Sequence, residues 1–429
     1  MNSIKSSRKI RFDFPTLNML KEDYLAKLAT EMLYQILNLL NDDDKKNLSL
    51  SCKWLYRVSR KFCFGFVAPY WDPITIEGIE EKLLTLNYRS GVWIDCKFYL
   101  IVFSKDNPIC WTLDLKKEHI VWSQAPVTLE MNLNSTFEPI RKFSATSVGN
   151  SIFIFGGENM ETNKFTNAFY EFETKTYVMR ILNSIRPPTA RKNHSLNAID
   201  KNRLVMFGGR CLTNEEEDSA SQEMYDTQDL FFYEIKENTW TSYIDTSNLP
   251  FRRSSHSSIV VNNDLYLYGG KQINSISTSQ VSRIHDDNDL YVYDFLRNNW
   301  HKYLAPPSNG MTLSTFLLPI NWIATSGVNV GRRKRSAIFT MQDKIIIFGG
   351  YERDDWNFEK EGRPWEFMKL LEPEKRNWKH IKVKNLPKIN CIAYIGEYKS
   401  ETKGIFVIGK DREKKPVIGW IKDSIVDLN

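Results

Sequence analysis

The stretch "IIIFGGYE", Ile345–Glu352, raises the question that decides the fold. Three isoleucines and a phenylalanine are typical of a buried strand, yet two glycines follow them at once. Glycine is depleted in strands because it loses the most conformational entropy on folding and has no side chain to pack. The same unit occurs elsewhere in the chain as "IFIFGGE", "LVMFGGR" and "LYLYGGK". This recurrence predicts a repeat architecture.

The repeated unit has the same parts in the same order each time. A semi-apolar strand and a short polar turn precede the glycine strand, and two more strands follow it. The glycine pairs are Gly156–Gly157, Gly208–Gly209, Gly269–Gly270 and Gly349–Gly350. The fourth strand carries an aromatic residue seven positions after an aromatic residue or leucine of the third, in the pairs Tyr170/Tyr177, Tyr233/Trp240, Tyr293/Trp300 and Leu371/Trp378. Four short strands form one antiparallel sheet that cannot bury both its faces alone, so the units are expected to stack.

Glycine pairs combined with the spaced aromatic residues Trp240, Trp300 and Trp378 resemble kelch repeats, which form β-propellers. The resemblance implies a mainly β fold, a kelch-type β-propeller of about six four-stranded blades, rather than an unrelated β-sandwich. Residues 98–124, with Leu115/Trp122, and residues 391–428, with Gly409, read as weaker units. Five or seven blades also fit, and either 81–90 or 423–428 could close the ring. The glycines are expected to allow close backbone approach and positive φ near the axis.

Residues 20–66 follow a helical rhythm, with apolar residues three and four positions apart. The acidic run Asn41–Asp44 suits the start of a second helix. The segment resembles an F-box, although Ala29 replaces the family's usual proline and Lys45 a common apolar residue. The residues that match its adaptor-binding pattern are Leu28, Glu31, Leu33, Ile36, Leu37, Leu40, Leu48, Cys52 and Trp54. So small a helical core also predicts a partner on physical grounds.

An F-box followed by kelch repeats implies the substrate-recognition subunit of an SCF-type E3 ubiquitin ligase. The F-box would bind the Skp-type adaptor, and through it the cullin and RING subunits, while the propeller holds a target protein. The expected organisation is a basic N-terminus (1–19), F-box helices (20–66), a linker that could supply a closing strand (67–90) and the propeller (91–429). The alternatives are a non-degradative kelch scaffold in the cytoskeleton or in trafficking, and a galactose-oxidase-like metal enzyme.

The resemblance to a receptor subunit implies no catalytic residue, no cofactor and no metal. A copper oxidase needs converging Tyr, His and Cys ligands. His194 and His256 occupy matching repeat positions, which favours a hydrogen-bonding role within each blade. The stretch Gly404–Lys410 has the spacing of a phosphate-binding loop, but it continues with Asp411 and lies in a strand pattern.

Long insertions follow the glycine pairs or lie between blades, so they are expected on one face of the propeller. Basic residues precede the first strands on that face and suit acidic or phosphorylated peptides. These substrate-binding candidates are Arg141, Arg191, Arg252, Arg253, Arg332, Arg333 and Arg335. Alternatively, such arginines pair with backbone carbonyls of the adjoining blade, or the acidic run 214–218 neutralises them.

Composition and charge bear on the cellular compartment and on binding to nucleic acid or membranes. The chain has 429 residues, a formal charge of +6 and six cysteines without a CxxC pair, which favours buried thiols in a reducing compartment. The charge is too small to indicate nucleic acid binding. Without a signal sequence or a long apolar run, we expect no membrane insertion and a cytoplasmic or nuclear location.

Overall fold

A computed structural model describes residues 70–74, 76, 91–117, 119–131, 136–213, 223–243, 249–271, 290–304, 322–327, 336–341, 344–349, 367–383, 385, 387, 391–398, 404–410 and 416–422. The chain divides into a unit of Met1–Val67 with Asp427–Asn429 and a second unit of Ala68–Val426. The description concerns the second unit. The predicted basic N-terminus (1–19) and F-box helices (20–66) lie outside the described residues, as does every predicted adaptor-binding residue from Leu28 to Trp54.

The strands form six sheets, called blades here and given from the innermost strand outward. Blade 1 consists of β2 (Gly91–Ile94), β3 (Lys97–Phe103), β4 (Pro108–Asp114) and β5 (Trp122–Pro126). Blade 2 consists of β8 (Ser144–Val148), β9 (Ser151–Asn159), β10 (Phe165–Glu173) and β11 (Val178–Ile181), with β7 (Ile140–Arg141) and β6 (Thr128–Glu130) added. Blade 3 consists of β12 (Ser195–Ala198), β13 (Arg203–Leu212), β14 (Met224–Glu234) and β15 (Thr239–Tyr243).

Blade 4 consists of β16 (Ser257–Val261), β17 (Asp264–Tyr268), β18 (Leu290–Asp294) and β19 (Asn299–Leu304), with β20 (Trp322–Ala324) added. Blade 5 consists of β22 (Ala337–Met341), β23 (Lys344–Phe348), β24 (Phe367–Glu372) and β25 (Asn377–Lys382), with β21 (Ser326–Gly327) added. Blade 6 consists of β26 (Cys391–Tyr398), β27 (Gly404–Lys410), β28 (Pro416–Lys422) and β1 (Tyr70–Pro73).

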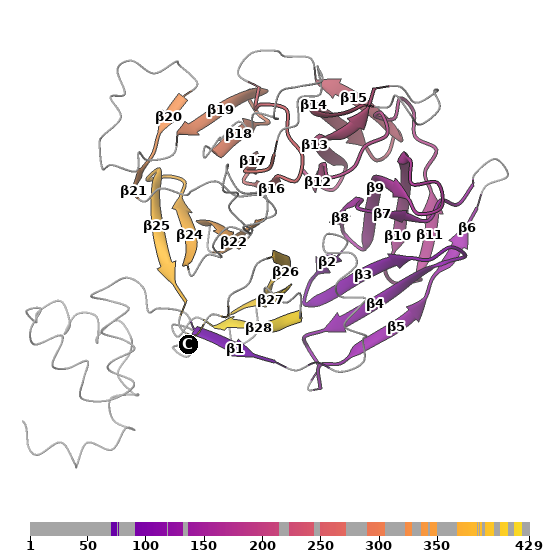
Figure 1. Ribbon diagram of the computed structural model, residues 1–429, viewed down its shortest axis with the longest axis horizontal. Coiled ribbons are helices and arrows are strands. Elements are labelled where there is room, and N and C mark those ends of the chain that lie inside the picture. Colours follow the sequence, from indigo (N-terminus) through magenta and orange to yellow (C-terminus); the bar gives the residue numbers. More distant parts are fainter. Residues whose placement is uncertain are drawn as a thin grey trace, which may run out of the picture. The chain divides into compact units, whose positions relative to one another are not determined.

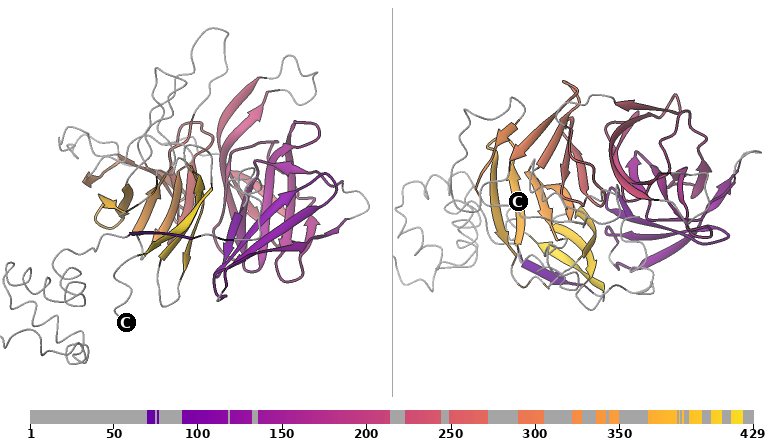
Figure 2. Two further views of the ribbon diagram at one scale, coloured as in Figure 1. Left: turned by 60° about the horizontal axis from the view of Figure 1, so that its bottom comes forward. Right: turned by 45° about the horizontal axis from the view of Figure 1, so that its top comes forward.

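The innermost strands close a ring. Each contacts the innermost strand of the next blade, in the order β2, β8, β12, β16, β22, β26 and back to β2. These six labels lie nearest the centre in Figure 1, and Figure 2 shows the same sheets, coloured along the sequence, from two other directions. The described unit is therefore a β-propeller, and the predicted number of about six blades is confirmed.

Blade 6 joins the two ends of the propeller sequence. Its outer strand β1 pairs antiparallel with β28, from Tyr70 opposite Lys422 to Pro73 opposite Gly419. The closing strand thus lies within the predicted linker 67–90. The two candidates for closing the ring, 81–90 and 423–428, lie outside the described residues. Hydrogen bonds between distant parts of the chain thus complete the four strands of blade 6 and hold the two ends of the propeller sequence together.

Large aromatic side chains hold neighbouring blades together. Trp240 of β15 lies 5.1 Å from Phe155 and 5.4 Å from Phe169, both of blade 2, between ring centroids. Trp300 of β19 lies 5.4 Å from Phe207 of blade 3. Because blades are covered on both faces, the strands that carry the glycine pairs are buried on both sides, and so their sequences read as continuous apolar runs.

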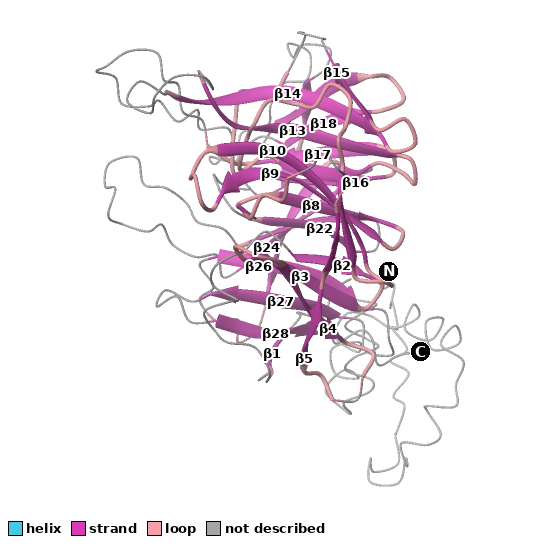
Figure 3. Ribbon diagram, turned by 90° about the vertical axis from the view of Figure 1, so that its right-hand side faces the viewer, coloured by secondary structure: helices cyan, strands magenta, loops and turns pink. Residues whose placement is uncertain are grey.

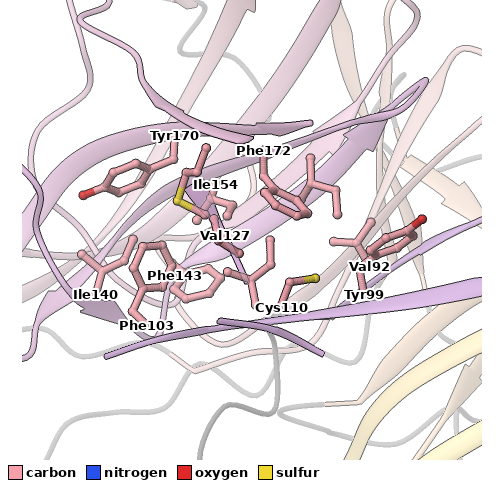
Figure 4. Close-up of a cluster of buried hydrophobic side chains, with 13 residues drawn as sticks. Val92, Tyr99, Phe103, Cys110, Val127, Ile140, Phe143, Ile154, Tyr170 and Phe172 are labelled. Carbon is pink, nitrogen blue, oxygen red and sulfur yellow. The ribbon is translucent and has the colours of Figure 1, made fainter. Parts of the chain in front are cut away.

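Blades 1 and 2 share the apolar cluster drawn in Figure 4. Phe103 of β3 lies 5.3 Å from Phe143 and 5.4 Å from Tyr170, between ring centroids. The buried Tyr170 hydroxyl donates to the carbonyl oxygen of Glu138 at 2.9 Å. A buried phenol needs such a partner, so Tyr170 serves the core of blade 2.

The strand register corrects two predicted pairs. In blade 2, Phe172 faces Met179, whereas Tyr170 faces Ile181 and Tyr177 lies in the turn with a φ of 57°. In blade 1, Leu113 faces Trp122, not Leu115, because the turn between β4 and β5 is longer. The pairs Tyr233/Trp240, Tyr293/Trp300 and Leu371/Trp378 are confirmed. A buried Met179 fills the place of the aromatic residue in blade 2, so a pattern of aromatic residues does not reveal this position.

The segment leading into a blade is tied to that blade's outer strand. In each of blades 2 to 5, the residue two positions before the core side chain of the outer strand has a left-handed backbone: Tyr177, Asn238, Asn298 and Arg376. The carbonyls of Tyr177, Asn238 and Arg376 accept hydrogen bonds from the backbone N–H groups of Thr128, Ile185 and Ser326 at 2.9, 2.8 and 2.9 Å. The carbonyl of Asn298 accepts from the hydroxyl of Tyr243. These bonds fix each blade to the chain segment that precedes it.

Candidate functional site

The blades present two different ends. At one end, called the glycine face, the glycine pairs meet the segments that lead into the next blade, as in the bonds from Gly157 N to Arg191 O at 2.8 Å and from Gly209 N to Arg253 O at 2.9 Å. At the other end, called the turn face, the third-to-fourth strand turns bond to the first-to-second turns, as in Thr174 N to Asn150 O at 2.9 Å. Figure 3 shows the strands in side view, with their ends gathered on the two faces.

The glycine pairs have the conformation that the sequence predicts. The first glycines have φ of 62–68° and the second, where described, 98–108°; Gly350 lies outside the described residues. A Cβ on Gly157 would lie 2.5 Å from the carbonyl oxygen of Arg141, and one on Gly209 would lie 2.7 Å from the Cβ of His194. Close approach and positive φ are therefore confirmed, and the pairs are structural.

Arg191 does not line a binding surface. Its side chain is fully buried, and Nη1 donates to the carbonyl of Gly208 at 3.0 Å. Nε donates to Thr189 O at 3.0 Å, and Nη2 lies 3.2 Å from the carboxylate of Asp229. Because the Arg191 carbonyl also accepts from Gly157, this one residue joins blade 2 to blade 3. The sequence left open that such an arginine pairs with backbone carbonyls of the adjoining blade. Arg191 does bond to a backbone carbonyl, but that carbonyl belongs to blade 3, the blade that Arg191 leads into.

Arg253 repeats this arrangement one blade further on. Its side chain is buried, and Nη1 donates to the carbonyl of Gly269 at 2.9 Å. Its own carbonyl accepts from Gly209, so it joins blade 3 to blade 4. The prediction that Arg191 and Arg253 form part of a substrate-binding ring is therefore corrected, because neither guanidinium reaches the surface.

His194 and His256 also contact the preceding blade. The ring of His194 lies 5.6 Å from Phe155 of blade 2, and that of His256 lies 5.5 Å from Phe207 of blade 3. Nε2 of His256 is 2.9 Å from the hydroxyl of Ser195 in blade 3. Both histidines are buried, and this hydrogen bond of His256 crosses the blade interface, whereas the sequence pattern predicted one within the blade.

Two of the predicted basic residues do lie at the surface of the glycine face. Arg252 is exposed, and the Arg141 side chain is 39% exposed. Arg332, Arg333 and Arg335 lie outside the described residues, as do most of the long insertions. The end of insertion 305–331 is described: β20 pairs in parallel with β19, which places this part on the propeller.

Three cations converge on Glu158, the residue that follows Gly157. Arg141 Nη2 lies 2.6 Å from Oε1, and Lys142 Nζ and Lys192 Nζ lie 2.8 and 2.9 Å from Oε2. We call Arg141, Lys142, Lys192 and Glu158 the Glu158 cluster. Lys192 comes from the segment leading into blade 3, so the cluster bridges two blades. Its ammonium also lies 4.1 Å from the ring centroid of Phe165.

The ionisation of Glu158 follows from these contacts. Burial alone would raise the pKa of the carboxyl, but the hydrogen bonds from Lys142, Arg141 and Lys192 lower it to about 2. The pKa of Lys192 is lowered by burial, against the attraction of Glu158. Glu158 is therefore a carboxylate throughout the physiological pH range.

A Glu158→Gln change tests this electrostatic role. The lowered pKa stabilises the folded state fully above about pH 4.5, and that contribution disappears as the pH falls toward 2. We expect Glu158→Gln to cost about 2 kcal/mol at pH 7, less than a fully buried pair because Arg141 and Lys142 are partly exposed. The cost should shrink below pH 4.5, as measured by urea unfolding from pH 7 to pH 3. A cost independent of pH, or an equal cost for the exposed Glu161→Gln, would contradict it.

Beside the cluster lies an ion pair whose two charges cancel. Arg210 Nε lies 2.9 Å from Asp226 Oδ1, and both residues are buried. Backbone bonds between Lys192 and Arg210, at 2.8 and 3.0 Å, place this pair next to the cluster.

The sequence analysis did not predict a role for Glu158. A usable signal was its place directly after a glycine pair, on the face where Arg141 and Lys192 were expected.

Within the described ranges, no group of three or more His, Cys, Asp or Glu side chains is placed to hold a metal ion. The described residues also contain no helix with the length and apolarity needed to span a bilayer.

Comparison with known proteins agrees with this geometry. Residues 104–315 match the KLHDC2/KLHL20/DRC7 Kelch-repeats domain. The chain is 25% identical over 251 residues to Kelch domain-containing protein 3 of Bos taurus, covering 54% of this chain and 53% of that protein. It is 28% identical over 132 residues to the Rab9 effector protein with kelch motifs of Danio rerio, covering 30% of this chain and 35% of the relative.

The chain spans only part of its relatives, between 46% and 60% of the four Kelch domain-containing protein 3 sequences. The matched residues 104–315 include the glycine pairs Gly156–Gly157, Gly208–Gly209 and Gly269–Gly270 and the bridging residues Arg191 and Arg253. Together with six sheets closed in a ring, it establishes the fold: the described part of the chain is a six-bladed β-propeller built from kelch repeats.

Proposed function

We propose that this protein is the substrate receptor of an SCF-type ubiquitin ligase. In this proposal, residues 20–66 bind the Skp-type adaptor and the propeller holds a target protein. In this proposal the ligase supplies the catalytic groups, and the chain acts by bringing the target close to the ligase's ubiquitin-charged partner. Such proximity makes a bimolecular encounter nearly intramolecular.

The path of the chain through blade 6 is the observation that carries the proposal. The second strand of a blade runs toward the glycine face, so β27 runs that way and β28 returns to the turn face at Lys422. Tyr70 pairs with Lys422, so the chain enters the propeller at the turn face. A target on the glycine face would then leave the end at which the chain enters the propeller unoccupied, which suits a protein that must hold two partners at once.

A non-degradative scaffold is the second candidate. Its support is the similarity to a protein named as a Rab9 effector with kelch motifs. A kelch propeller serves protein interaction in either case, so the leading segment decides between the two functions.

Replacement of two apolar residues in the leading segment tests the adaptor role. The double change Leu33→Asp with Ile36→Asp should abolish binding of a purified Skp-type adaptor, because it buries two carboxylates in an apolar helix contact. Binding would be measured by pull-down with the full chain. The thermal melt of the propeller should stay within about 2 °C of the unchanged protein, because the changes lie outside it. Retained adaptor binding by the double variant would rule out the F-box assignment.

A further inference from the structure

The Glu158 cluster carries more positive charge than it needs for its own carboxylate. Arg141, Lys142 and Lys192 contact Glu158, and in the described part of the chain no other ion pair is recorded for these three cations. The neighbouring Arg210 is neutralised by Asp226. Three cations against one carboxylate leave a local charge of +2. That excess lies on the glycine face, between the second and third blades.

The donors of the cluster are also partly available. Each ammonium has three N–H donors, and the contact with Glu158 uses one of them. Arg141 Nη2 donates both to Glu158 and to Asn163 Oδ1, at 2.6 and 2.9 Å, so a ligand would use the N–H groups of Nη1. The side chains of Lys142 and Arg141 are 48% and 39% exposed, whereas Lys192 and Glu158 are nearly buried. Glu158 therefore acts as an internal anchor that draws three long side chains together before any ligand arrives. Holding them in place in advance reduces the entropy that binding would otherwise cost.

We propose that the Glu158 cluster is the subsite that holds a carboxylate side chain of an acidic peptide segment in the partner. A glutamate or aspartate of the partner would approach Lys142 and Arg141 from solvent and accept hydrogen bonds from their free donors. Two cations that converge on one carboxylate give charge-assisted bonds of the stronger kind. Naming this segment as part of a target rests on the proposed function, but the subsite itself would serve a scaffold equally well.

The repeat itself supplies a variant that should fold. Lys142 has a left-handed backbone with a φ of 59°, and the equivalent residues of blades 3 and 4 are Asn193 and Ser255, with φ of 57° and 59°. Arg141 occupies the position that Ser254 fills in blade 4. The double change Arg141→Ser with Lys142→Asn therefore introduces residues that this fold already accepts at these positions. Asparagine tolerates the left-handed region well.

The experiment measures fluorescence anisotropy of labelled peptides with the full chain at low ionic strength. One peptide alternates glutamate with serine, a second has glutamine in place of glutamate, and a third alternates phosphoserine with glycine. We expect the glutamate peptide to bind and the glutamine peptide not to bind. Arg141→Ser with Lys142→Asn should weaken binding about tenfold, while Arg180→Gln with Arg203→Gln, which removes the same charge from exposed ion pairs elsewhere, should change it less than about twofold.

Glu158→Gln should strengthen peptide binding, the opposite of the effect expected for Arg141→Ser with Lys142→Asn. It removes the competing negative charge but keeps a side-chain oxygen that can accept hydrogen bonds from the cations and so retain part of the anchor. Binding of the glutamate peptide should therefore tighten about threefold although the protein becomes less stable. A cluster that only stabilises the blades would not produce tighter binding. Equal binding of the glutamate and glutamine peptides, binding of the phosphoserine peptide alone, or equal losses in the two double variants would overturn the proposal. Failure of adaptor binding would contradict the proposed function and leave these results unaffected.

Discussion

Gly157→Ala should unfold the propeller at a temperature about 10 °C below that of the unchanged protein, from a loss of about 3–5 kcal/mol. The new Cβ would lie 2.5 Å from the carbonyl oxygen of Arg141 and 3.0 Å from the backbone nitrogen of Phe143. Both are backbone atoms, so no flexible side chain can move away. The φ of 108° adds strain because it lies in a region that side-chain-bearing residues rarely adopt.

Gly149 provides the matched control within the same blade. It has a φ of 59°, but a Cβ there would have no other atom within 4 Å. Gly149→Ala should therefore cost only about 1 kcal/mol of backbone strain. Thermal and urea unfolding of both variants separate the two effects. If Gly157→Ala melts within about 2 °C of Gly149→Ala, close packing at the glycine pair is not what selects glycine.

Arg191→Ala should cost about 3–4 kcal/mol, because it leaves the buried carbonyl of Gly208 and the carbonyl of Thr189 without their donors and opens a cavity in blade 3. The same guanidinium lies 5.2 Å from the ring centroid of Phe231, and this contact would also be lost. Arg191→Lys should recover only part of the loss, because an ammonium cannot reproduce the planar fork of donors. Urea unfolding at pH 7 measures both variants.

Arg252→Ala is the control for the arginine change. Arg252 is an exposed neighbour of the buried Arg253, so its loss should change stability by less than about 0.5 kcal/mol. Arg253→Ala should resemble Arg191→Ala, because its Nη1 bonds to the Gly269 carbonyl in the same way. A surface role for Arg191 would give the reverse order, with little change in stability and a direct loss of partner binding.

The repeat made much of the fold predictable. A strand that ends in two glycines has few explanations. The unit recurs along the chain, and its recurrence identified the blades, together with the fixed spacing of Trp240, Trp300 and Trp378. Local patterns of this kind survive in a single sequence because neighbouring residues make them. The closing strand could not be predicted in this way. Tyr70–Pro73 is short, and its partner β28 lies at the other end of the chain.

The chemistry of the glycine face was harder to predict. Arg191 and Arg252 both look like basic residues before a first strand, yet one is buried and the other exposed. The difference is a one-residue offset, since Arg253 rather than Arg252 is the equivalent of Arg191. The Glu158 cluster joins residues from two blades, and contacts over such distances in sequence leave no periodic signal.

The half-life of proteins that co-purify with this chain tests the central claim most directly. The partners would be identified by affinity purification of the full chain, and their turnover followed after new synthesis is blocked, with the chain present and with it depleted. A substrate receptor predicts that depletion lengthens the half-life of at least one partner severalfold, and that the Leu33→Asp, Ile36→Asp variant fails to restore it. Partners that co-purify but turn over at the same rate in both conditions would contradict the account and leave a scaffold in its place.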